Sequence, residues 1–434
     1  MKHTIFLAVL ALTATAARAA YVDIVPAELR HYKVNEKVTF KVAAYDKPGK
    51  LLNKGKFTIS VSEAGNRKLM DDLTVDLAEK NDFTFTVSLD RPGFILASAG
   101  SLNVDGKKVK WSNKPYRPYG GAAVEPEKIP MAAPRPADFD KFWADGLKEF
   151  NAAQVIVTPE KKLKRNGYDL SKIEVKFPGN RGSIYGYLSI PQDRSKKYPA
   201  QIGVPGAGPG SLGAAPSYRG TAPAIEAWLN VHKFAPGKNG AEQKKRLAEF
   251  TKKLPEKFYP IGNISDRNTY FFRDVWLALS KVVDYVATLK EFDGKNFAAI
   301  GSSQGGGTAL AVAYLNKKIS CVFVNVPALC DHSGWMVKRV SGWPQAHTKS
   351  KGKGDKVMPY FDGINFAAGI TVPTFVTVGF IDTTCPPAGV YAMYNQLKGK
   401  KQMYDMPRLG HVVPPEMRKL TDQFYQQEFG CITK

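Results

Sequence analysis

Cysteine is scarce in this chain of 434 residues. A sequence-wide search finds no paired C-x-x-C spacing of the kind that zinc sites use. A disulfide-rich scaffold and a structural zinc site are therefore excluded. We expect ordinary buried thiols, and the spacing leaves one disulfide open. The cysteines are Cys321, Cys330, Cys385 and Cys431.

A hydrophobic run long enough to cross a membrane is missing from the start of the chain. The apolar run from Ile5 to Leu12 is shorter than the roughly 20 residues that a transmembrane helix needs. It follows Lys2 and precedes the small-residue stretch Ala17-Arg18-Ala19, which is typical of a cleavable signal peptide over residues 1–19. No cysteine follows the run to mark a lipid-attached start. We expect a mature protein that is soluble, has no membrane span, and is secreted or periplasmic.

Acidic residues are outnumbered by basic ones. The 39 Asp and Glu residues against 62 Lys and Arg residues give a formal net charge of +23. The lysines are scattered in groups such as 161–164, 244–245 and 349–356, and aromatic residues are not interleaved with them as in a nucleic-acid-binding surface. Nucleic acid is therefore not an expected partner. An exported protein would also rarely meet nucleic acid. The charge predicts a solvated surface that would favour anionic polymers or envelope surfaces.

The segment after the leader has the alternation of half-buried strands. Val38, Phe40 and Val42 alternate with polar residues, and the same period of two recurs over residues 83–89. Short turn signals separate these strands, which predicts an immunoglobulin-like β-sandwich over residues 20–114. Residues 115–136 are rich in proline and glycine and are predicted to be a linker.

The pattern changes over residues 137–434, where helices and strands alternate. Amphipathic helical segments occupy 138–150 and 275–289, and short apolar strands occupy 200–204, 298–300, 321–324 and 374–378. This order predicts a doubly wound, mostly parallel sheet of the α/β class. The stretch 209–264 is longer than a simple crossover needs, so we expect it to fold over the strand ends and to shape a site there.

One motif in this region can supply a nucleophile. Gly301-Ser302-Ser303-Gln304-Gly305 follows an apolar strand and precedes a helical segment. A sharp strand-to-helix turn with glycine neighbours is the way an α/β-hydrolase exposes a reactive serine. We therefore predict an α/β-hydrolase with Ser303 as its nucleophile. The alternative is a purely structural glycine-rich turn.

The base and the acid must follow Ser303 in the order of this fold, which is nucleophile, acid, histidine. His411 is the best placed base because it follows a strand and Gly410, and His332 and His347 are more typical of surface or cap positions. Asp382 follows the strand 374–378 and is the preferred acid. Asp331 is the runner-up, and two further acidic residues, Asp362 and Asp405, are less well placed.

An oxyanion hole requires two backbone N–H donors. One is expected at Gln304, directly after the nucleophile, and the other in the loop Pro205-Gly206-Ala207-Gly208 that follows an earlier strand. Pro205 has no N–H, and Ala207 is our choice among the remaining three. The loop could also be a phosphate-binding turn, but it lacks the Lys-Ser/Thr ending of a P-loop.

The hydrolase region resembles the acetyl xylan esterase and cephalosporin C deacetylase family of carbohydrate esterases over about 300 residues from Arg135. The resemblance implies a Ser303–Asp382–His411 triad that needs no metal and no cofactor. It departs at Pro205-Gly206-Ala207, where the family commonly has His-Gly-Tyr, and at its Arg-Gly-Gln motif, of which Arg219-Gly220 is the one candidate remnant. The matching segments are Arg135-Pro136-Ala137-Asp138-Phe139-Asp140-Lys141-Phe142-Trp143, Gly301 to Gly307, Val326-Pro327-Ala328-Leu329-Cys330-Asp331, Asp382-Thr383-Thr384-Cys385-Pro386-Pro387 and Gly410-His411.

The family implies hydrolysis of acetyl esters on xylan or other acetylated oligosaccharides, which would be the partner of this protein. Trp335 and Arg219 are candidate substrate contacts; Trp335 and Trp343 could stack on sugar rings, although packing in the interior is the favoured role for both. Three alternatives remain: a serine peptidase, a lipase-like esterase, and an inactive carbohydrate-binding protein whose N-terminal sandwich does the work. Homo-oligomer formation is left open.

Overall fold

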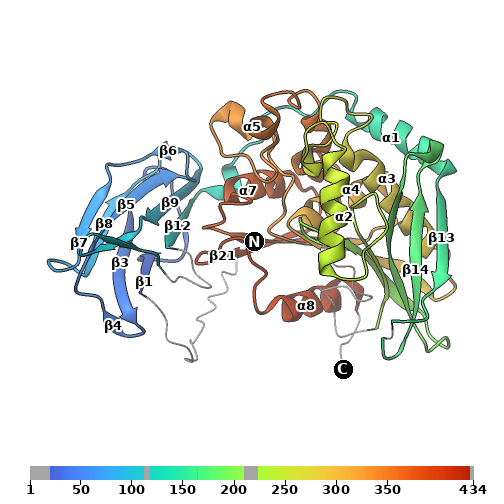
Figure 1. Ribbon diagram of the computed structural model, residues 1–434, viewed down its shortest axis with the longest axis horizontal. Helices are drawn as coiled ribbons and strands as arrows, with labels where there is room; N and C mark the ends of the chain where they lie inside the picture. The colour runs from blue at the N-terminus through green and yellow to red at the C-terminus, as the bar shows by residue number, and fades with distance from the viewer. Residues whose placement is uncertain (1–19, 112–117, 164, 210–222, 431–434) are drawn as a thin grey trace.

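A computed structural model describes residues 20–111, 118–163, 165–209 and 223–430 of the chain. The predicted signal peptide, residues 1–19, lies outside these ranges. Figure 1 shows two lobes, a smaller one built of strands on the left and a larger one of helices and strands on the right. Within the described ranges, no helix is both long enough and apolar enough to cross a membrane.

The smaller lobe contains two β-sheets. In the first sheet, β3 pairs with β1, β4 and β8. The second sheet has the order β11-β10-β5-β9-β12-β2, and β6 and β7 also pair with β5. The strands are β1 (Tyr21–Pro26), β2 (His31–Tyr32), β3 (Val38–Lys47), β4 (Lys50–Leu51), β5 (Lys56–Glu63), β6 (Arg67–Lys68), β7 (Leu73–Asp76), β8 (Asp82–Val87), β9 (Gly93–Ala99), β10 (Leu102–Val104), β11 (Lys107–Val109) and β12 (Tyr119–Val124).

The alternation of apolar residues places one face of each sheet in a shared core. Phe40 on β3 stacks on Phe85 of β8 with ring centroids 5.2 Å apart. Both belong to one hydrophobic cluster with Ile59 and Ile95 of the second sheet. The two sheets therefore pack against each other through their apolar faces. That this lobe is immunoglobulin-like stays a prediction.

The segment 115–136, predicted to be a linker, contains a strand of the smaller lobe. Strand β12 pairs antiparallel with β9 along its whole length, and five of its six residues are buried. Gly120 and Gly121 made the composition of this strand resemble that of a linker. In the structure they permit close packing, since a Cβ on Gly121 would lie 2.8 Å from the carbonyl oxygen of Phe380. The N-terminal lobe therefore extends to residue 124, ten residues beyond the boundary that we expected.

The larger lobe is organised around a sheet of nine strands in the order β13-β14-β15-β17-β16-β18-β19-β20-β21. Its first three strands run antiparallel to their neighbours, and the six from β17 to β21 in this order are parallel. The strands are β13 (Gln154–Pro159), β14 (Tyr168–Lys176), β15 (Ser183–Pro191), β16 (Tyr198–Val204), β17 (Ile225–Leu229), β18 (Phe292–Ser302), β19 (Cys321–Asn325), β20 (Thr374–Gly379) and β21 (Lys401–Met406). The mostly parallel sheet that the sequence predicted is present.

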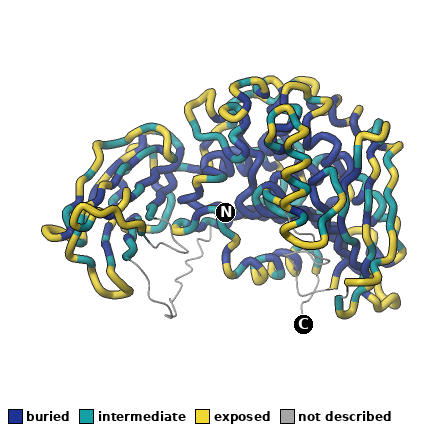
Figure 2. Tube along the Cα trace, viewed as in Figure 1, coloured by how far each residue is buried: buried dark blue, intermediate teal, exposed yellow. Residues whose placement is uncertain are grey.

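Helices cover both faces of this sheet. Alternate residues of β18 point to opposite sides, so that Phe297 and Ala299 join the core with α3 and α4 while Ala298 and Ile300 join the core under α8. Figure 2 shows the buried sheet as a dark blue centre inside exposed loops and helix faces. The helices are α1 (Phe139–Glu149), α2 (Gly240–Lys252), α3 (Phe271–Val286), α4 (Gln304–Leu315), α5 (Ala346–Ser350), α6 (Gly363–Ala367), α7 (Pro387–Gln396) and α8 (Met417–Phe429).

The two lobes share apolar and polar contacts at one junction. Phe94 of β9 packs on Phe380 and Tyr391 of the larger lobe, with ring centroids 5.2 Å and 5.6 Å apart. Next to them, Nε2 of His31 lies 2.8 Å from a carboxylate oxygen of Asp405. Because Phe94 belongs to the main core cluster of the larger lobe, the core runs without a break from one lobe into the other.

We expect Gly121→Ala to destabilise the chain by about 1–3 kcal/mol, because the new methyl group would meet the backbone of Phe380, which cannot rotate away. Gly240→Ala is the matched control, since a Cβ at Gly240 would meet no atom within 4 Å. Its free energy of unfolding should change by less than about 0.5 kcal/mol. Urea denaturation of both variants measures the difference, and equal stability of the two would contradict the close packing of the lobes.

Candidate active site

Ser303 lies at the sharp turn between β18 and α4. Its backbone has φ 55° and ψ −122°, a conformation that residues other than glycine rarely adopt. The turn is possible because glycines flank it: a Cβ on Gly301 would lie 2.2 Å from the backbone of Gly305, and one on Gly305 would lie 2.3 Å from the carbonyl oxygen of Val204. The glycines of the motif thus permit the backbone approaches that hold Ser303 beyond the sheet.

His411 and Asp382 meet Ser303 at the carboxyl end of the parallel strands. Nε2 of His411 lies 2.9 Å from Oγ of Ser303, and its Nδ1 lies 2.7 Å from Oδ2 of Asp382. An ionised carboxylate only accepts hydrogen bonds, so Nδ1 carries the proton and Nε2 is left to accept from the serine hydroxyl. The structure therefore brings together the three residues that the order of the sequence suggested.

Asp382 is fixed by its own loop. Its side chain has no exposed surface, and its Oδ1 accepts hydrogen bonds from the backbone N–H groups of Thr384, at 2.8 Å, and Cys385, at 2.9 Å. These bonds satisfy one carboxylate oxygen and leave the other for His411. The Asp-x-x-Cys order of the sequence thus has a local structural reason.

Cys385 completes the only group of donor atoms among the described residues that could hold a metal ion. Atoms of Asp382, Cys385 and His411 lie within 4.8 Å of one another. Burial raises the pKa of the Cys385 thiol well above its usual range, so the thiol stays protonated and is a poor metal ligand. The carboxylate and the imidazole are already hydrogen-bonded to each other. The donor set therefore fits a proton-transfer chain better than a metal centre.

The loop 205–208, predicted to supply an oxyanion donor, lies beside Ser303. A Cβ on Gly206 would lie 3.9 Å from the Cβ of Ser303. Pro205 has no N–H, and the N–H of Gly208 donates to the hydroxyl of Tyr259 at 3.3 Å. Only the N–H groups of Gly206 and Ala207 in this loop are then left for a ligand. The elimination keeps Ala207 as a candidate donor and removes Gly208.

Two residues that sequence reasoning missed hold this loop in place. The Tyr259 hydroxyl donates to Oε1 of Gln304 at 2.7 Å, and Nε2 of His232 lies 2.7 Å from the carbonyl oxygen of Gly208. The other end of the loop is tied as well, because Nε2 of Gln304 donates to the carbonyl oxygen of Pro205 at 3.4 Å. Burial lowers the pKa of His232 to about 4, so the ring is neutral and its Nε2–H is the donor to the carbonyl. No motif signalled these residues, since His232 and Tyr259 lie in the long insertion 209–264, outside its strand and its long helix.

The alternative acids have other partners. Asp331 is fully buried in a two-pronged ion pair with Arg339, at 2.8 Å and 2.9 Å. Asp362 accepts hydrogen bonds from the backbone N–H groups of Asp331 and His332, and burial together with the charge of Asp331 raises its pKa to about 7. Asp405 is bonded to His31 and to Tyr391. None of these carboxylates contacts His411 in the described structure.

The remaining candidates are two histidines, two tryptophans and one arginine. His332 is buried, so of its two expected positions, surface or cap, the surface position is wrong. His347 is paired with Asp355 at 2.9 Å. Trp343 packs against the main core, whereas Trp335 is 39% exposed, so the favoured interior role is wrong for Trp335. Arg219 lies outside the described residues.

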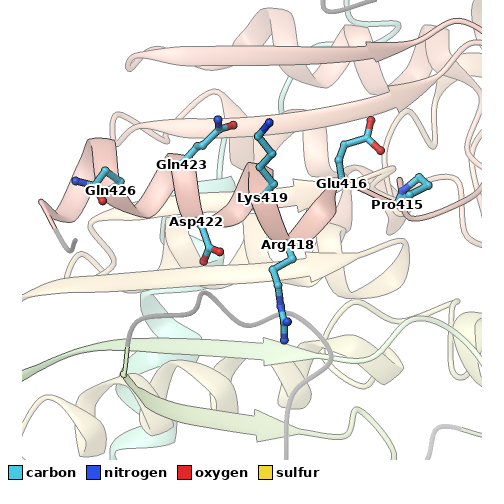
Figure 3. A pocket seen from close by; sticks show the side chains of 7 residues that line it. All are labelled: Pro415, Glu416, Arg418, Lys419, Asp422, Gln423 and Gln426. Atoms are coloured by element: carbon cyan, nitrogen blue, oxygen red, sulfur yellow. The ribbon is translucent and has the colours of Figure 1, made fainter. Parts of the chain in front are cut away.

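A hollow of about 550 Å³ lies elsewhere, along the exposed side of α8. Figure 3 shows the seven side chains that line it, all of them from residues 415–426. They include carboxylates and cations, but none of the three residues Ser303, Asp382 and His411. Its size therefore does not mark the reacting centre.

Comparison with known proteins identifies the relatives of the chain. The profile described as acetyl xylan esterase (AXE1) matches residues 128–428, which is more than half of the chain. The acetyl esterase Axe7A of Xylanibacter ruminicola is 31% identical over 326 residues, covering 74% of this chain and 71% of that protein.

Solved structures show the same fold. The acetyl xylan esterase of Paenibacillus sp. R4 superposes with a TM-score of 0.58 at 21% identity, covering 70% of this chain and 98% of that one. Acetyl xylan esterase 1 of Thermoanaerobacterium sp. JW/SL YS485 gives a TM-score of 0.55 at 19% identity, with the same two coverages. The larger lobe thus has the α/β-hydrolase fold, as predicted. The chain belongs to the acetyl xylan esterase family and is a serine esterase.

Proposed function

We propose that this esterase removes acetyl groups from xylan or from other acetylated oligosaccharides, with Ser303, His411 and Asp382 as its catalytic triad. The observation that carries the proposal is the unbroken hydrogen-bond chain from Asp382 through His411 to Ser303. Membership of the acetyl xylan esterase family supports the substrate class. No step of this chemistry requires a metal ion or a cofactor.

Acylation begins when Oγ of Ser303 attacks the carbonyl carbon of the acetyl ester. Nε2 of His411 takes the serine proton, and the buried Asp382 carboxylate stabilises the imidazolium that forms. When the tetrahedral intermediate collapses, the C–O bond to the sugar breaks and His411 returns the proton to the sugar oxygen. The products are a free sugar hydroxyl and acetyl-Ser303.

The negative charge of the tetrahedral oxygen requires two donors. The backbone N–H of Gln304, the first residue of α4, is one, and the N–H of Ala207 is the other. Helix α4 adds its positive N-terminal end at the same place. The bonds of Gln304 and Tyr259 with the loop 205–208 keep the second donor aimed at the tetrahedral oxygen without reorganisation.

Deacylation repeats the same steps with water. His411 takes a proton from a water molecule whose oxygen attacks the acetyl carbon, and the second tetrahedral intermediate expels Ser303 Oγ, which recovers the proton. The product is acetic acid, which releases its proton to the solvent to give acetate, and the free enzyme is restored. Atoms and charges balance with one water consumed for each acetyl group.

The other hydrolases and the inactive binding protein are less well supported. A complete hydrogen-bonded triad argues against an inactive carbohydrate-binding protein. The family profile names acetyl xylan esterases, not peptidases or lipases. We also propose that residues 1–19 direct the chain to secretion or to the periplasm, where polymeric substrate would be met.

We expect Ser303→Ala to lower kcat for acetate release by about 10³-fold or more, because no other group can form the acetyl-enzyme. The matched control is the neighbouring Ser302→Ala, which loses only a hydrogen bond from Asn325. It should retain kcat within about 10-fold. Assays use p-nitrophenyl acetate, longer acyl esters and acetylated xylan, following acetate release.

Two outcomes would contradict the proposed function. Activity that survives in Ser303→Ala would remove the mechanism, and preference of the wild-type enzyme for long acyl chains would remove the deacetylase assignment.

Asp382→Asn should lower kcat by roughly 10³- to 10⁴-fold, because an amide cannot stabilise the imidazolium and can hold the wrong tautomer of His411. Asp331→Asn tests the competing acid, since it perturbs a buried ion pair with Arg339. That variant should lose stability but keep kcat per folded molecule. Active-site titration combined with thermal denaturation separates the two effects. A larger loss of kcat in Asp331→Asn than in Asp382→Asn would reverse the assignment.

Tyr259→Phe should lower kcat by about 5- to 30-fold with little change in KM, because the lost hydroxyl bonds hold an oxyanion donor that acts only in the transition state. The matched control is Tyr270→Phe, which removes another buried hydroxyl whose bond goes to the carbonyl oxygen of Pro260. Its kcat should stay near the wild-type value. Steady-state kinetics on p-nitrophenyl acetate compare them, and equal losses in both variants would show that Tyr259 acts only through stability.

A further inference from the structure

Three consecutive apolar side chains are exposed on the segment between β19 and β20. Trp335, Met336 and Val337 are 39%, 57% and 38% exposed, and they account for three of the seven strongly exposed large hydrophobic residues in the described part of the chain. Single exposed apolar residues need no explanation, but a contiguous group of them marks a binding surface. We call these three residues the apolar patch.

The indole of Trp335 is held in a fixed orientation. It stacks on the imidazole of His347 with ring centroids 3.9 Å apart and an angle of 16° between the planes. Nδ1 of His347 is in turn bonded to both carboxylate oxygens of Asp355, at 2.9 Å and 3.0 Å. An aromatic ring that is both exposed and fixed from one side costs little entropy when a ligand covers its free surface.

A pocket of about 270 Å³ is lined by Trp335, Met336, His347 and Asp355, and by none of the triad residues. His332 lines it too, and the described residues supply no hydrogen-bond partner to either of its ring nitrogens. Both ring nitrogens are buried, so a ligand has to reach to the base of the pocket to meet them. Burial lowers the pKa of His332 to about 3, so the ring is neutral and has one donor and one acceptor, which is the pattern that matches a hydroxyl group. An aromatic wall together with such a polar group is the composition of a saccharide site.

The segment that contributes most of the pocket is rich in lysines. Lys356 lines it, and Lys338, Lys349, Lys351 and Lys353 are exposed on the same segment, which carries helix α5 of Figure 1. None of these five lysines forms an ion pair with a described residue, whereas the carboxylate of Asp355 at the same pocket is bonded to His347. The local charge is therefore available to an anionic ligand.

The pocket lies close to the reacting serine. The N–H of Ala328 donates to the backbone oxygen of Ser303 at 2.9 Å, and His332 follows only four residues later. At 3.8 Å between consecutive Cα atoms, His332 lies within about 15 Å of Ala328. A polymer chain that presents an acetyl group to Ser303 could reach the pocket with a neighbouring part of the same chain.

We propose that this pocket is a second saccharide-binding site, which takes a sugar that carries a carboxylate, on the polymer whose acetyl groups Ser303 removes. Trp335 covers the face of the sugar ring, His332 bonds a hydroxyl group, and Lys356 pairs with the carboxylate. The site rests on the proposed function only in taking an acetylated polysaccharide as the substrate. It also provides a use for the excess of basic residues, by selecting acidic polymers over neutral ones.

The test measures binding of the full chain to deacetylated glucuronoxylan and to neutral arabinoxylan by calorimetry, so that no turnover is needed. Trp335→Ala should weaken binding to glucuronoxylan about 5- to 10-fold, and Trp335→Phe should retain most of the affinity. Lys356→Gln should weaken it about 3-fold at about 0.05 M salt and hardly at about 0.5 M, without effect on arabinoxylan.

Lys108→Gln on β11 of the N-terminal lobe is the matched control, and its affinity should equal that of the wild type. All four variants should retain the wild-type kcat/KM on p-nitrophenyl acetate. Unchanged affinity in Trp335→Ala would overturn the proposal, and so would a loss of affinity that accompanies a change in oligomeric state by light scattering, because the apolar patch would then be an interface between copies. If the proposed function were wrong, the assays would differ in another way. Glucuronoxylan would still bind to the chain, but no acetate would be released from the acetylated polymer.

Discussion

The strained backbone of Ser303 is the constraint on which the rest of the site depends. A residue at φ 55° and ψ −122° persists only where its surroundings leave no alternative. Here the two flanking glycines let α4 approach β18 and β16 so closely that a single methyl group would collide with backbone. The sheet therefore determines where the serine projects, and the strand ends around it determine what it can meet.

The parallel strands also determine which residues meet Ser303. His411 follows β21 and Asp382 follows β20, and both strands are parallel to β18 in the same sheet. Their carboxyl ends meet at one edge, so residues separated by up to 108 positions come within hydrogen-bond distance. The loop after β16 joins them from the opposite side, fixed by the hydroxyl of Tyr259. The arrangement of Ser303, His411 and Asp382 is thus a consequence of strand order, and Tyr259 ties the remaining loop to α4, which begins next to Ser303.

Sequence reasoning predicted which residues meet where a local pattern has one physical cause. The glycine spacing around Ser303, and the order of Asp382 and His411 along the chain, follow directly from the requirements of the fold. Strand β12 was missed because its glycine and alanine residues have the composition of a linker, while their small size serves packing between lobes. Tyr259 was missed because its role comes from contacts between distant segments. Exposure of Trp335 could not be inferred for a similar reason, since tryptophan is common both in cores and at binding surfaces.

The N-terminal lobe takes part in the architecture of the site and is more than an appended module. Phe380 and Ile381 directly precede Asp382, and both lie against Gly121 of β12, while Phe94 packs on the ring of Phe380. The loop that holds the catalytic carboxylate candidate is therefore supported from behind by the first lobe. Its bonds to Thr384 and Cys385 orient the carboxylate locally, but the backbone that carries it rests on a core shared by both lobes. A change in the first lobe that loosened this contact would displace Asp382 more than Ser303. The backbone of Ser303 is held by its own strand, β18, and its own helix, α4.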